Sequence, residues 1–451
     1  MKKIIPQFIR NIYHLGQAIL ANFIFSFPSK NLIVIGVTGT NGKTTTVHMI
    51  TAIFEEAGYK VAAASTINFK IGEKKWVNET KFTTLSSFQV QKFLRQAADA
   101  KCQYAILETS SHSLDQNRVW GIKYKIAAIT NVTREHLDYH RNMEEYRVAK
   151  LKLFNRAETA VVNLDMAKPE EFLQCGAENA YGYTAQNQNV KIKMQNGNEK
   201  LKIIVAKNIK TSIDHSKYQI QDTEYQIHLP GLFNIENALA ATCAGLSQSI
   251  DLKTIKIALE KIAGIPGRME YVPNDKNIDI IIDYAVTPDS LEKLYFLINT
   301  IKCHSCESRN LVNKSKNMRL DSRLRGNDNK SKIISVFGAC GERDRGKRPI
   351  MGSIVDKYAD RIILTNEDPY NENPEQIVND LTEGIKNKKE GESLWKILDR
   401  REAIKKALRM AEPGDIVAVT GKGAEVTMAI GKKRIPWSDK AIILEELRFL
   451  N

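Results

Sequence analysis

The sequence predicts an α/β fold, with a mainly parallel sheet in the central part of the chain and a smaller Rossmann-like α/β part at the C-terminal end. Short apolar runs alternate with longer amphipathic segments, which is the order of strand–helix–strand units. The 451 residues are enough for two or three domains, and 43% hydrophobic with 26% charged residues is typical of a globular protein. We expect an N-terminal helical segment over 1–30, a central domain over 31–264 and a C-terminal domain over 265–451.

The first thirty residues are basic at their start and apolar further on, as in a signal peptide or a membrane anchor. Polar residues interrupt the apolar run and no small-residue cleavage site follows, which argues against both. Apolar residues at helical spacing predict an amphipathic helix: Ile12, Leu15, Ile19, Phe23 and Ile24. We expect this helix to pack on the protein, with peripheral contact to a membrane surface as the alternative.

The stretch VTGTNGKTTT, residues 37–46, has the ending of a phosphate-binding loop but not its usual beginning. Gly42, Lys43 and Thr44 fit the pattern G-x-x-x-x-G-K-[ST], whereas Val37 holds the position of its first glycine. The preceding run NLIVIGV predicts a buried strand, and the residues that follow have helical apolar spacing. Such a strand, turn and helix form an anion site, to which Lys43 would add a charge and Thr44 a ligand for Mg²⁺. The alternative is a tight turn before a surface helix.

Two further apolar runs, YAILET (104–109) and KIAAITNV (125–132), predict buried strands that end in polar residues. Ligands bind at the carboxyl ends of the strands in open α/β sheets. Glu108 lies at one such end and His136 follows the other, so a carboxylate and an imidazole would converge beside the phosphate loop. With the Thr44 hydroxyl they could hold a divalent cation, whereas in isolation both would be ordinary polar residues at strand ends.

The C-terminal part contains four strand-like runs, IDIIIDY, KIISVFG, RIILTN and DIVAVTG. Between a helix-like run (289–301) and KIISVFG lies a segment, 303–332, that is rich in Asn and Ser and lacks sustained periodicity. Its eight Lys or Arg and three Asp or Glu supply +5 of the formal net charge of +14. We expect an exposed, disordered basic insertion here, a solvated loop rather than a nucleic-acid site. The remaining excess suits a protein that handles anionic substrates.

The six cysteines are scattered, and only Cys303 and Cys306 lie close together in the chain. No second C-x-x-C pair is present to complete a zinc site, so we expect free thiols in a reducing compartment. The sequence therefore predicts a cytoplasmic protein, which we expect to be monomeric and to bind small molecules rather than nucleic acid.

Several longer motifs resemble the ATP-dependent Mur ligases of peptidoglycan synthesis, most closely the MurE type, which adds the third residue to UDP-N-acetylmuramoyl-L-alanyl-D-glutamate. The family's phosphate loop has the sequence T-G-T-N-G-K-T, which matches residues 38–44 and accounts for the displaced glycine. The other matching motifs follow in the expected order: ETSSHSLDQNRV (108–119), HLDYHRNMEEYRVAK (136–150), GRMEYV (267–272), DYAVTPDSLEKL (283–294), ERDRGKRPIMG (342–352) and GKGAE (421–425). The resemblance extends from about residue 32 to the end, apart from 303–332.

The resemblance implies a P-loop-like ATPase domain and an amide ligase that uses ATP and Mg²⁺. An acceptor carboxylate would attack the γ-phosphate, and the amine of an amino acid would displace phosphate from the acyl phosphate. The residues implied for ATP are Gly39, Thr40, Asn41, Gly42, Lys43, Thr44, Thr45, Asn237, Arg268 and Asp283, the last two closing on ATP from the C-terminal domain. The catalytic residues implied are Lys43, Glu108, His136 and Lys150.

The metal ligands implied by the resemblance are Thr44, Glu108 and His136, with Lys150 as a fourth position. Lys150 matches a lysine that is carbamylated by CO₂ in relatives, where the new carboxylate serves a second Mg²⁺. Without the resemblance, Lys150 would be interpreted as a surface cation.

The resemblance also assigns the two remaining substrates. Residues matching those that bind the muramoyl-dipeptide acceptor are Thr83, Thr84, Ser110, Gln116 and Arg118. Residues at amino-acid-binding positions are Arg343, Glu367, Asp368, Tyr370, Gly421 and Glu425. Arg343 would bind the α-carboxylate and Glu425 would contact a distant amino group, and the alternative for both is a surface charge near a turn.

Three features depart from the family pattern. MurE-type ligases have a separate N-terminal domain that holds the uridine end of the acceptor, whereas about thirty residues precede the first strand here. We therefore expect an acceptor that is held differently, is lipid-linked or is not a UDP sugar. The segment D-N-P-R of diaminopimelate-adding relatives is replaced by Glu367-Asp368-Pro369-Tyr370, and tyrosine cannot provide an arginine's fork for a second carboxylate. Histidines expected in DYAHTPD and GKGHE are replaced by Val286 and Ala424.

Two other classes of function stay open. A ligase similar to folylpolyglutamate synthase would also start directly at its phosphate loop, but it is not expected to contain HLDYH together with SSHSLDQNR. A non-catalytic ATP-binding protein on the same fold is expected to have lost Lys43, Glu108, His136 or Lys150, and all four are present.

Overall fold

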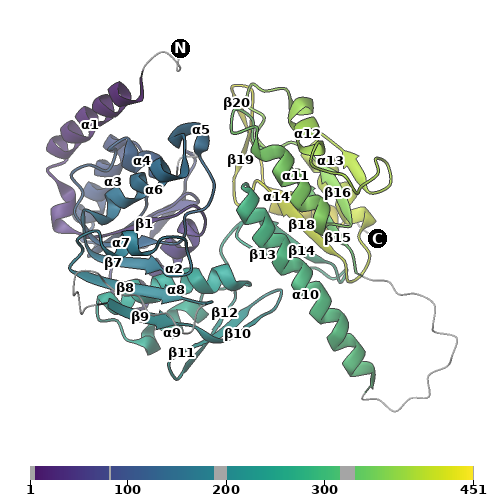
Figure 1. The fold of residues 1–451 in the computed structure, drawn as a ribbon, viewed down its shortest axis with the longest axis horizontal. Helices are drawn as coiled ribbons and strands as arrows, with labels where there is room; N and C mark the ends of the chain where they lie inside the picture. The colour runs from purple at the N-terminus through teal and green to yellow at the C-terminus, as the bar shows by residue number, and fades with distance from the viewer. Residues whose placement is uncertain (1–5, 81–82, 187–200, 315–330, 450–451) are drawn as a thin grey trace. The chain divides into compact units, whose positions relative to one another are not determined.

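The structure is a computed structural model that describes residues 6–80, 83–186, 201–314 and 331–449. The chain divides into two compact units. The first unit consists of residues 1–211 and 215–263, and the second unit of residues 212–214 and 264–451. Each unit contains a mainly parallel sheet covered by helices (Figure 1), which confirms the predicted α/β class.

The described part of the first unit has a nine-stranded sheet in the order β4-β3-β2-β5-β1-β6-β7-β8-β9. From β2 to β9 all neighbours are parallel, while β3 and β4 form an antiparallel edge. β1 lies between β5 and β6, so the carboxyl ends of these three strands meet at one edge, where open α/β sheets bind ligands. The strands are β1 (Ile33–Thr38), β2 (Val61–Ala64), β3 (Asn68–Ile71), β4 (Lys74–Val77), β5 (Tyr104–Glu108), β6 (Tyr124–Ile129), β7 (Ala157–Asn163), β8 (Asn179–Thr184) and β9 (Leu201–Val205).

Helices cover both faces of this sheet, which is why its strands are apolar throughout rather than alternating. On one face α2 packs against α8 and α9; on the other, a core of buried residues joins the sheet to α3, α4, α6 and α7. A separate three-stranded sheet consists of β10 (Lys207–Thr211), β11 (Ser216–Ile220) and β12 (Thr223–Ile227). The helices are α2 (Lys43–Glu56), α3 (Ser87–Asp99), α4 (Ser111–Asp115), α5 (Leu137–His140), α6 (Met143–Phe154), α7 (Glu170–Leu173), α8 (Leu232–Ser247) and α9 (Leu252–Glu260), with a 3₁₀ turn at Pro28–Asn31.

The described part of the second unit has a six-stranded sheet in the order β13-β14-β18-β15-β16-β17, parallel except for β13 at one edge. The strands are β13 (Glu270–Tyr271), β14 (Asp279–Asp283), β15 (Ile333–Phe337), β16 (Arg361–Leu364), β17 (Leu394–Lys396) and β18 (Ile416–Thr420), and a separate ribbon pairs β19 (Thr427–Ile430) with β20 (Lys433–Pro436). The helices are α10 (Pro288–Lys314), α11 (Lys347–Tyr358), α12 (Pro374–Thr382), α13 (Arg400–Met410) and α14 (Asp439–Leu447). Isoleucines and valines of the strands pack against α13 and α14 in a buried core.

Helix α1 (Gln7–Ile24) forms where the amphipathic pattern predicts it, but with the opposite face toward the protein. Ala18 and Ala21 are fully buried, whereas Ile12 and Phe23 are 64% and 65% exposed. The helix packs against α3 as predicted, and Leu15 and Ile19 are half-buried. The prediction that the whole apolar stripe faces the protein is wrong, because hydrogen bonds from polar side chains attach the opposite side of the helix. Among the helices of the described residues, none combines the length and the apolar character that crossing a bilayer requires.

Helix α10 runs through Lys314, well past residue 301, where the predicted helical run ends. Residues 303–314, the first part of the expected insertion, are therefore helical. They include no Pro or Gly, so nothing in their backbone chemistry ends the helix. The predicted disorder of the following residues, 315–330, falls outside the described residues.

Candidate nucleotide and substrate sites

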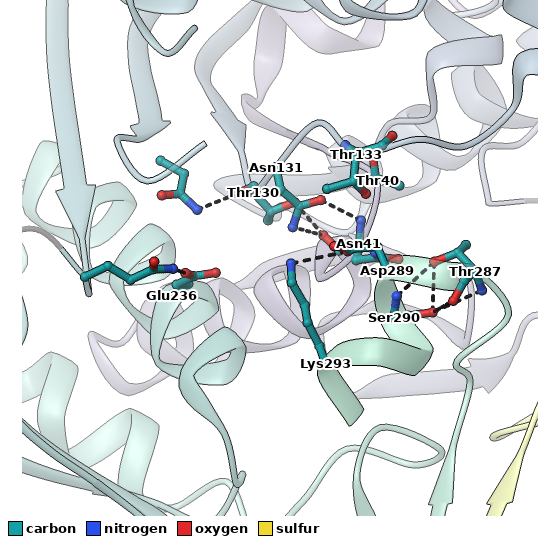
Figure 2. Close-up of polar contacts among 12 residues, drawn as sticks. Thr40, Asn41, Thr130, Asn131, Thr133, Glu236, Thr287, Asp289, Ser290 and Lys293 are labelled. Atoms are coloured by element: carbon teal, nitrogen blue, oxygen red, sulfur yellow. Dashed lines mark hydrogen bonds and ion pairs between the residues drawn. The ribbon is translucent and has the colours of Figure 1, made fainter. Parts of the chain in front are cut away.

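The loop between β1 and α2 is held by the end of the neighbouring strand β6. The backbone N–H of Asn41 donates to Oδ1 of Asn131 at 2.9 Å, and Nδ2 of Asn131 donates to the Asn41 carbonyl at 3.2 Å (Figure 2). The Thr130 hydroxyl donates to the same carbonyl at 2.5 Å, and the Thr40 N–H donates to the Asn131 carbonyl at 3.0 Å. The loop is thus fixed by bonds within the protein. Thr130 and Asn131 are not among the predicted site residues, although their position at a strand end was a signal.

Two glycines allow close approach of the loop backbone to its neighbours. Gly39 has φ +147°, and a Cβ there would lie 1.9 Å from Oγ1 of Thr130. Gly42 has φ +84°, and a Cβ there would lie 2.2 Å from Oδ1 of Asn237. Any side chain at either position would collide with these groups, so the loop requires glycine at both. The structure brings Asn237, from α8 and predicted to contact ATP, directly to the loop.

Two lysines reach the carbonyls of this loop. Nζ of Lys43 donates to the carbonyls of Thr40 at 2.8 Å and Gly39 at 3.2 Å, and Nζ of Lys150 donates to the Gly39 carbonyl at 2.8 Å. Lys150 is only 1% exposed, and its Nζ lies 4.2 Å from the centroid of the Tyr146 ring. Burial, and then the charge of Lys43, lower the pKa of Lys150 well below its usual value. The alternative interpretation of Lys150 as a surface cation is therefore wrong.

Glu108, at the end of β5, is buried beside the start of α2. Its Oε2 accepts hydrogen bonds from the Thr44 hydroxyl at 3.0 Å and the Thr66 N–H at 2.7 Å, and its Oε1 accepts from the Thr66 hydroxyl at 2.9 Å. Carboxylate and hydroxyl oxygens are the ligands that Mg²⁺ prefers. The pairing of Glu108 with Thr44, at the N-terminus of a 14-residue helix, therefore fits a Mg²⁺ ion that accompanies phosphates.

His136 precedes α5 and belongs to an aromatic cluster beside the loop. Its ring centroid lies 4.7 Å from that of His112 and 6.1 Å from that of Tyr146, whose hydroxyl is 3.1 Å from Oγ1 of Thr40. Across the ranges that the structure describes, no three His, Cys, Asp or Glu side chains are grouped to hold a metal ion. A metal ion at the predicted site would therefore be bound by Glu108 and His136 together with the Thr44 hydroxyl. Its remaining ligands would be oxygens that do not come from His, Cys, Asp or Glu side chains.

We expect Glu108→Ala and His136→Ala to lower Mg²⁺-dependent ATP turnover by about 10²-fold or more, because each removes a ligand of the predicted metal site. Turnover measured against Mg²⁺ concentration checks this, with the exposed Glu145→Ala as the matched control. Near-normal turnover in both variants over the whole Mg²⁺ range would contradict the assignment.

The residues predicted to bind the acceptor lie together in the first unit. Oγ1 of Thr84 donates to Oγ of Ser110 at 3.1 Å. Arg118 donates from Nη1 to the Thr84 carbonyl at 3.1 Å and from Nε to Oε1 of Gln116 at 2.8 Å. A small pocket beside these hydrogen-bonded residues is lined by Thr83, Thr84, Glu108 and six apolar residues. The pocket therefore joins the predicted acceptor residues to the predicted metal ligand.

In the second unit, several of the predicted amino-acid residues surround a buried lysine, Lys422, that the sequence did not predict. Its Nζ donates to Oδ1 of Asp368 at 2.7 Å and to the carboxylate of Glu425. Burial raises the pKa of Glu367 to about 7, although the charge of Lys422 opposes the shift. The signal for Lys422 was its position inside the motif GKGAE, between the assigned Gly421 and Glu425.

The other residues predicted to bind the amino-acid substrate differ in their surroundings and in their exposure to solvent. Gly421 has φ +108°, and a Cβ there would lie 2.9 Å from Oε2 of Glu367. Tyr370 is half-buried, and burial raises its pKa to about 12, so the phenol is neutral near pH 7. Arg343 is exposed as a whole residue, and its guanidinium lies beside Cys340.

Arg268 and Asp283 lie side by side in the second unit. The Asp283 carboxylate accepts a hydrogen bond from the Met269 N–H at 2.7 Å. Burial raises the pKa of Asp283 to about 6, and the nearby charge of Arg268 opposes the rise. The Arg268 guanidinium stacks 4.6 Å from the centroid of the Tyr284 ring.

This fold and this loop define an α/β protein with a phosphate-binding loop, and comparison with known proteins gives its family. Residues 37–245 match the Mur ligase middle domain, and residues 320–423 match the Mur ligase, glutamate ligase domain. The Clostridium botulinum UDP-N-acetylmuramoyl-L-alanyl-D-glutamate--2,6-diaminopimelate ligase is 36% identical over 440 residues, which are 96% of this chain and 81% of the relative. A UDP-N-acetylmuramyl-tripeptide synthetase of Roseiflexus is 32% identical over 444 residues, 94% of this chain and 80% of the relative. The chain belongs to the Mur ligase family, as the sequence motifs predicted.

Solved structures agree with this assignment. A UDP-N-acetylmuramoyl-L-alanyl-D-glutamate--2,6-diaminopimelate ligase superposes with a TM-score of 0.57 at 30% identity, over 93% of this chain and 78% of the other. Folylpolyglutamate synthase of Mycobacterium tuberculosis, complexed with ADP and AMPPCP, gives a TM-score of 0.67 at 16% identity. The match covers 90% of this chain and 92% of the synthase. At that identity the second similarity shows the fold alone.

Proposed function

We propose that the chain joins the amine of an amino acid to a muramoyl-dipeptide-like carboxylate, with ATP as the phosphate donor and Mg²⁺ as the cofactor. The observation that carries the proposal is the cluster at the ends of β1, β5 and β6. There a preformed phosphate loop, the Glu108 carboxylate and the buried Lys150 amine lie next to the predicted acceptor residues. Relatives named as UDP-N-acetylmuramoyl-L-alanyl-D-glutamate ligases support it.

The reaction has two steps. An acceptor carboxylate oxygen attacks the γ-phosphorus of ATP, the bond to the bridging oxygen breaks, and ADP leaves. The amino-acid amine then attacks the acyl carbon, phosphate leaves with the electrons of its C–O bond, and the nitrogen loses a proton. Mg²⁺, when bound, would neutralise charge on the phosphates. The loop N–H groups and Lys43 would hold those phosphates, and Thr84, Ser110 and Arg118 would orient the acceptor.

Lys150 fits the carbamylation that the family resemblance implies. CO₂ reacts with a neutral amine, and the lowered pKa of Lys150 favours that form. The nitrogen lone pair attacks the carbon of CO₂, and one N–H proton leaves to water. The product carries a negative carboxylate on a side chain that already reaches Gly39 of the phosphate loop. Lys150 would thereby become an oxygen ligand for a second Mg²⁺.

We further propose that the incoming amino acid is dibasic, such as L-lysine or L-ornithine. Tyr370 stands where the diaminopimelate-adding relatives have an arginine, so a second carboxylate of the substrate would find no guanidinium fork there. The nearby carboxylates are those of Glu367, Asp368 and Glu425, and the cations close to them are the Lys422 ammonium and the Arg400 guanidinium. A second ammonium on the substrate could pair with Glu425, whose carboxylate lies at this site and accepts from Lys422.

An ATP-to-ADP assay of the purified chain, run across panels of acceptors and amino acids with mass spectrometry of the products, tests the proposal. We expect turnover to require both a muramoyl-dipeptide-like acceptor and an amino acid. In competition, lysine or ornithine should be incorporated about ten- to a hundredfold better than meso-diaminopimelate, because a charge-assisted bidentate pair contributes about 1.5–3 kcal/mol.

Glu425→Gln should reduce this preference while leaving ATP binding unchanged, and the exposed Glu390→Gln serves as its matched control. Diaminopimelate incorporated at least as well as lysine would overturn the selectivity assignment but not the ligase. Turnover with a folate acceptor and glutamate, but with no muramoyl acceptor, would instead overturn the proposed acceptor.

A further inference from the structure

Helix α1 lies along the outside of the first unit, at the edge where α3 and α4 lie (Figure 1). A row of its large apolar side chains is exposed. The helix has 18 residues and is therefore about 27 Å long. The exposed fractions of seven side chains lie between 45% and 65%; these residues form what we call the apolar face: Phe8, Ile9, Ile12, Tyr13, Leu20, Phe23 and Ile24. So large a continuous apolar surface is unusual on a monomeric protein and marks an interaction site.

The attachment of α1 to the first unit uses its polar side. Nδ2 of Asn22 donates to the Trp120 carbonyl at 2.8 Å, and Nδ2 of Asn11 donates to Oδ2 of Asp115 at 3.2 Å. At the beginning of the helix, Gln7 donates to the Tyr139 hydroxyl. The helix is therefore held along its length with its apolar face directed outward, the reverse of ordinary amphipathic packing.

The charge of the segment identifies the kind of partner. Residues 1–30 include four Lys or Arg and no Asp or Glu. Of these basic residues, Arg10 in α1 and Lys30 in the 3₁₀ turn that follows the helix are exposed. An anionic lipid surface complements both the apolar face and the positive charge, whereas a second copy of the chain would bring two basic segments together. Since α1 is not suited to crossing a bilayer, the contact would lie in the plane of the headgroups.

We propose that α1 is an interfacial helix that docks the protein on an anionic membrane surface, with the apolar face inserted at headgroup level. This docking is independent of the ligase chemistry, because none of the seven residues of the apolar face belongs to the predicted substrate sites. The helix would bind reversibly, since one short amphipathic helix with a few basic residues gives moderate affinity.

Sedimentation of the full-length chain with lipid vesicles tests the proposal. We expect binding to vesicles of phosphatidylcholine with phosphatidylglycerol, and weaker binding to phosphatidylcholine alone or at high salt. The triple variant Phe8→Ser, Ile12→Ser, Phe23→Ser should bind about tenfold or more weakly. The matched control, Phe296→Ser with Phe449→Ser, removes aromatic side chains that are 62% and 71% exposed elsewhere, and it should bind as the unchanged chain does.

ATP turnover and melting temperature of the triple variant should equal those of the unchanged chain, and the single variant Ile12→Asp provides a milder change if the triple variant does not fold. The proposal is overturned if the unchanged chain fails to bind anionic vesicles, or if the variants bind as strongly as it does. A dimer in light scattering that the substitutions dissociate would assign the apolar face to a second copy instead.

Discussion

Lys43→Ala should abolish ATP turnover, with a loss of about 10³-fold or more, because it removes the cation that would face the β- and γ-phosphates. Nζ of Lys43 is held at the loop by the carbonyls of Gly39 and Thr40, within the segment whose N–H groups would bind the phosphates. The neighbouring Lys150 cannot replace it, since burial lowers the pKa of Lys150 and favours an uncharged amine.

Steady-state ADP release measures this loss, and a melting curve establishes that the variant is folded. Lys125→Ala is the matched control, because Lys125 forms an exposed ion pair with Glu158 that contributes little to stability. Turnover close to that of the unchanged chain in Lys43→Ala would exclude the phosphate loop as the ATP site.

Lys150→Ala should lower turnover by about 10²-fold or more, provided that a carbamate on this lysine holds a metal ion. In the unchanged chain, removing CO₂ and bicarbonate from the buffer should reduce turnover, and restoring bicarbonate should recover it. Intact-mass measurement under gentle conditions should reveal one added CO₂, which Lys150→Ala cannot carry.

The control for Lys150 is Lys168→Ala, which removes an exposed lysine of the first unit. Lys150→Arg separates the two possible roles of the residue, since arginine keeps a positive charge but does not form this carbamate. If Lys150→Arg retains full turnover, or if bicarbonate has no effect on the unchanged chain, the lysine acts as a cation and the carbamate assignment fails.

Features of the site that depend on short stretches of sequence were predictable. The phosphate loop needs one strand, one turn and one helix start in sequence order, and all three are encoded between residues 31 and 57. The position of Glu108 at the carboxyl end of a strand follows from the rule that parallel strands end at one edge, whereas Asn131, after β6 on the other side of β1, was not predicted as a site residue. What the sequence could not give is the partner of each group, such as Thr66 for Glu108, because that depends on which strands become neighbours.

Two other features show the limits of periodicity and motif reasoning. The spacing of apolar residues in α1 defines an apolar face but not its direction, which is set by hydrogen bonds to residues about a hundred positions away. Lys422 was missed because a lysine between two glycines is ordinarily a solvated charge, and only the packing of β18 and the following turn buries it against Asp368.

The hydrogen bonds that hold the phosphate loop have a consequence for the thermodynamics of nucleotide binding. A flexible glycine-rich segment loses backbone conformational entropy when a ligand orders it, at roughly 1–2 kcal/mol for each residue fixed. Here hydrogen bonds to Asn131 and Thr130 restrain the loop. The backbone conformational entropy of the loop is therefore lost when the protein folds, before any nucleotide binds. ATP would then meet a receptor that needs little rearrangement, and more of its contact energy remains available for affinity.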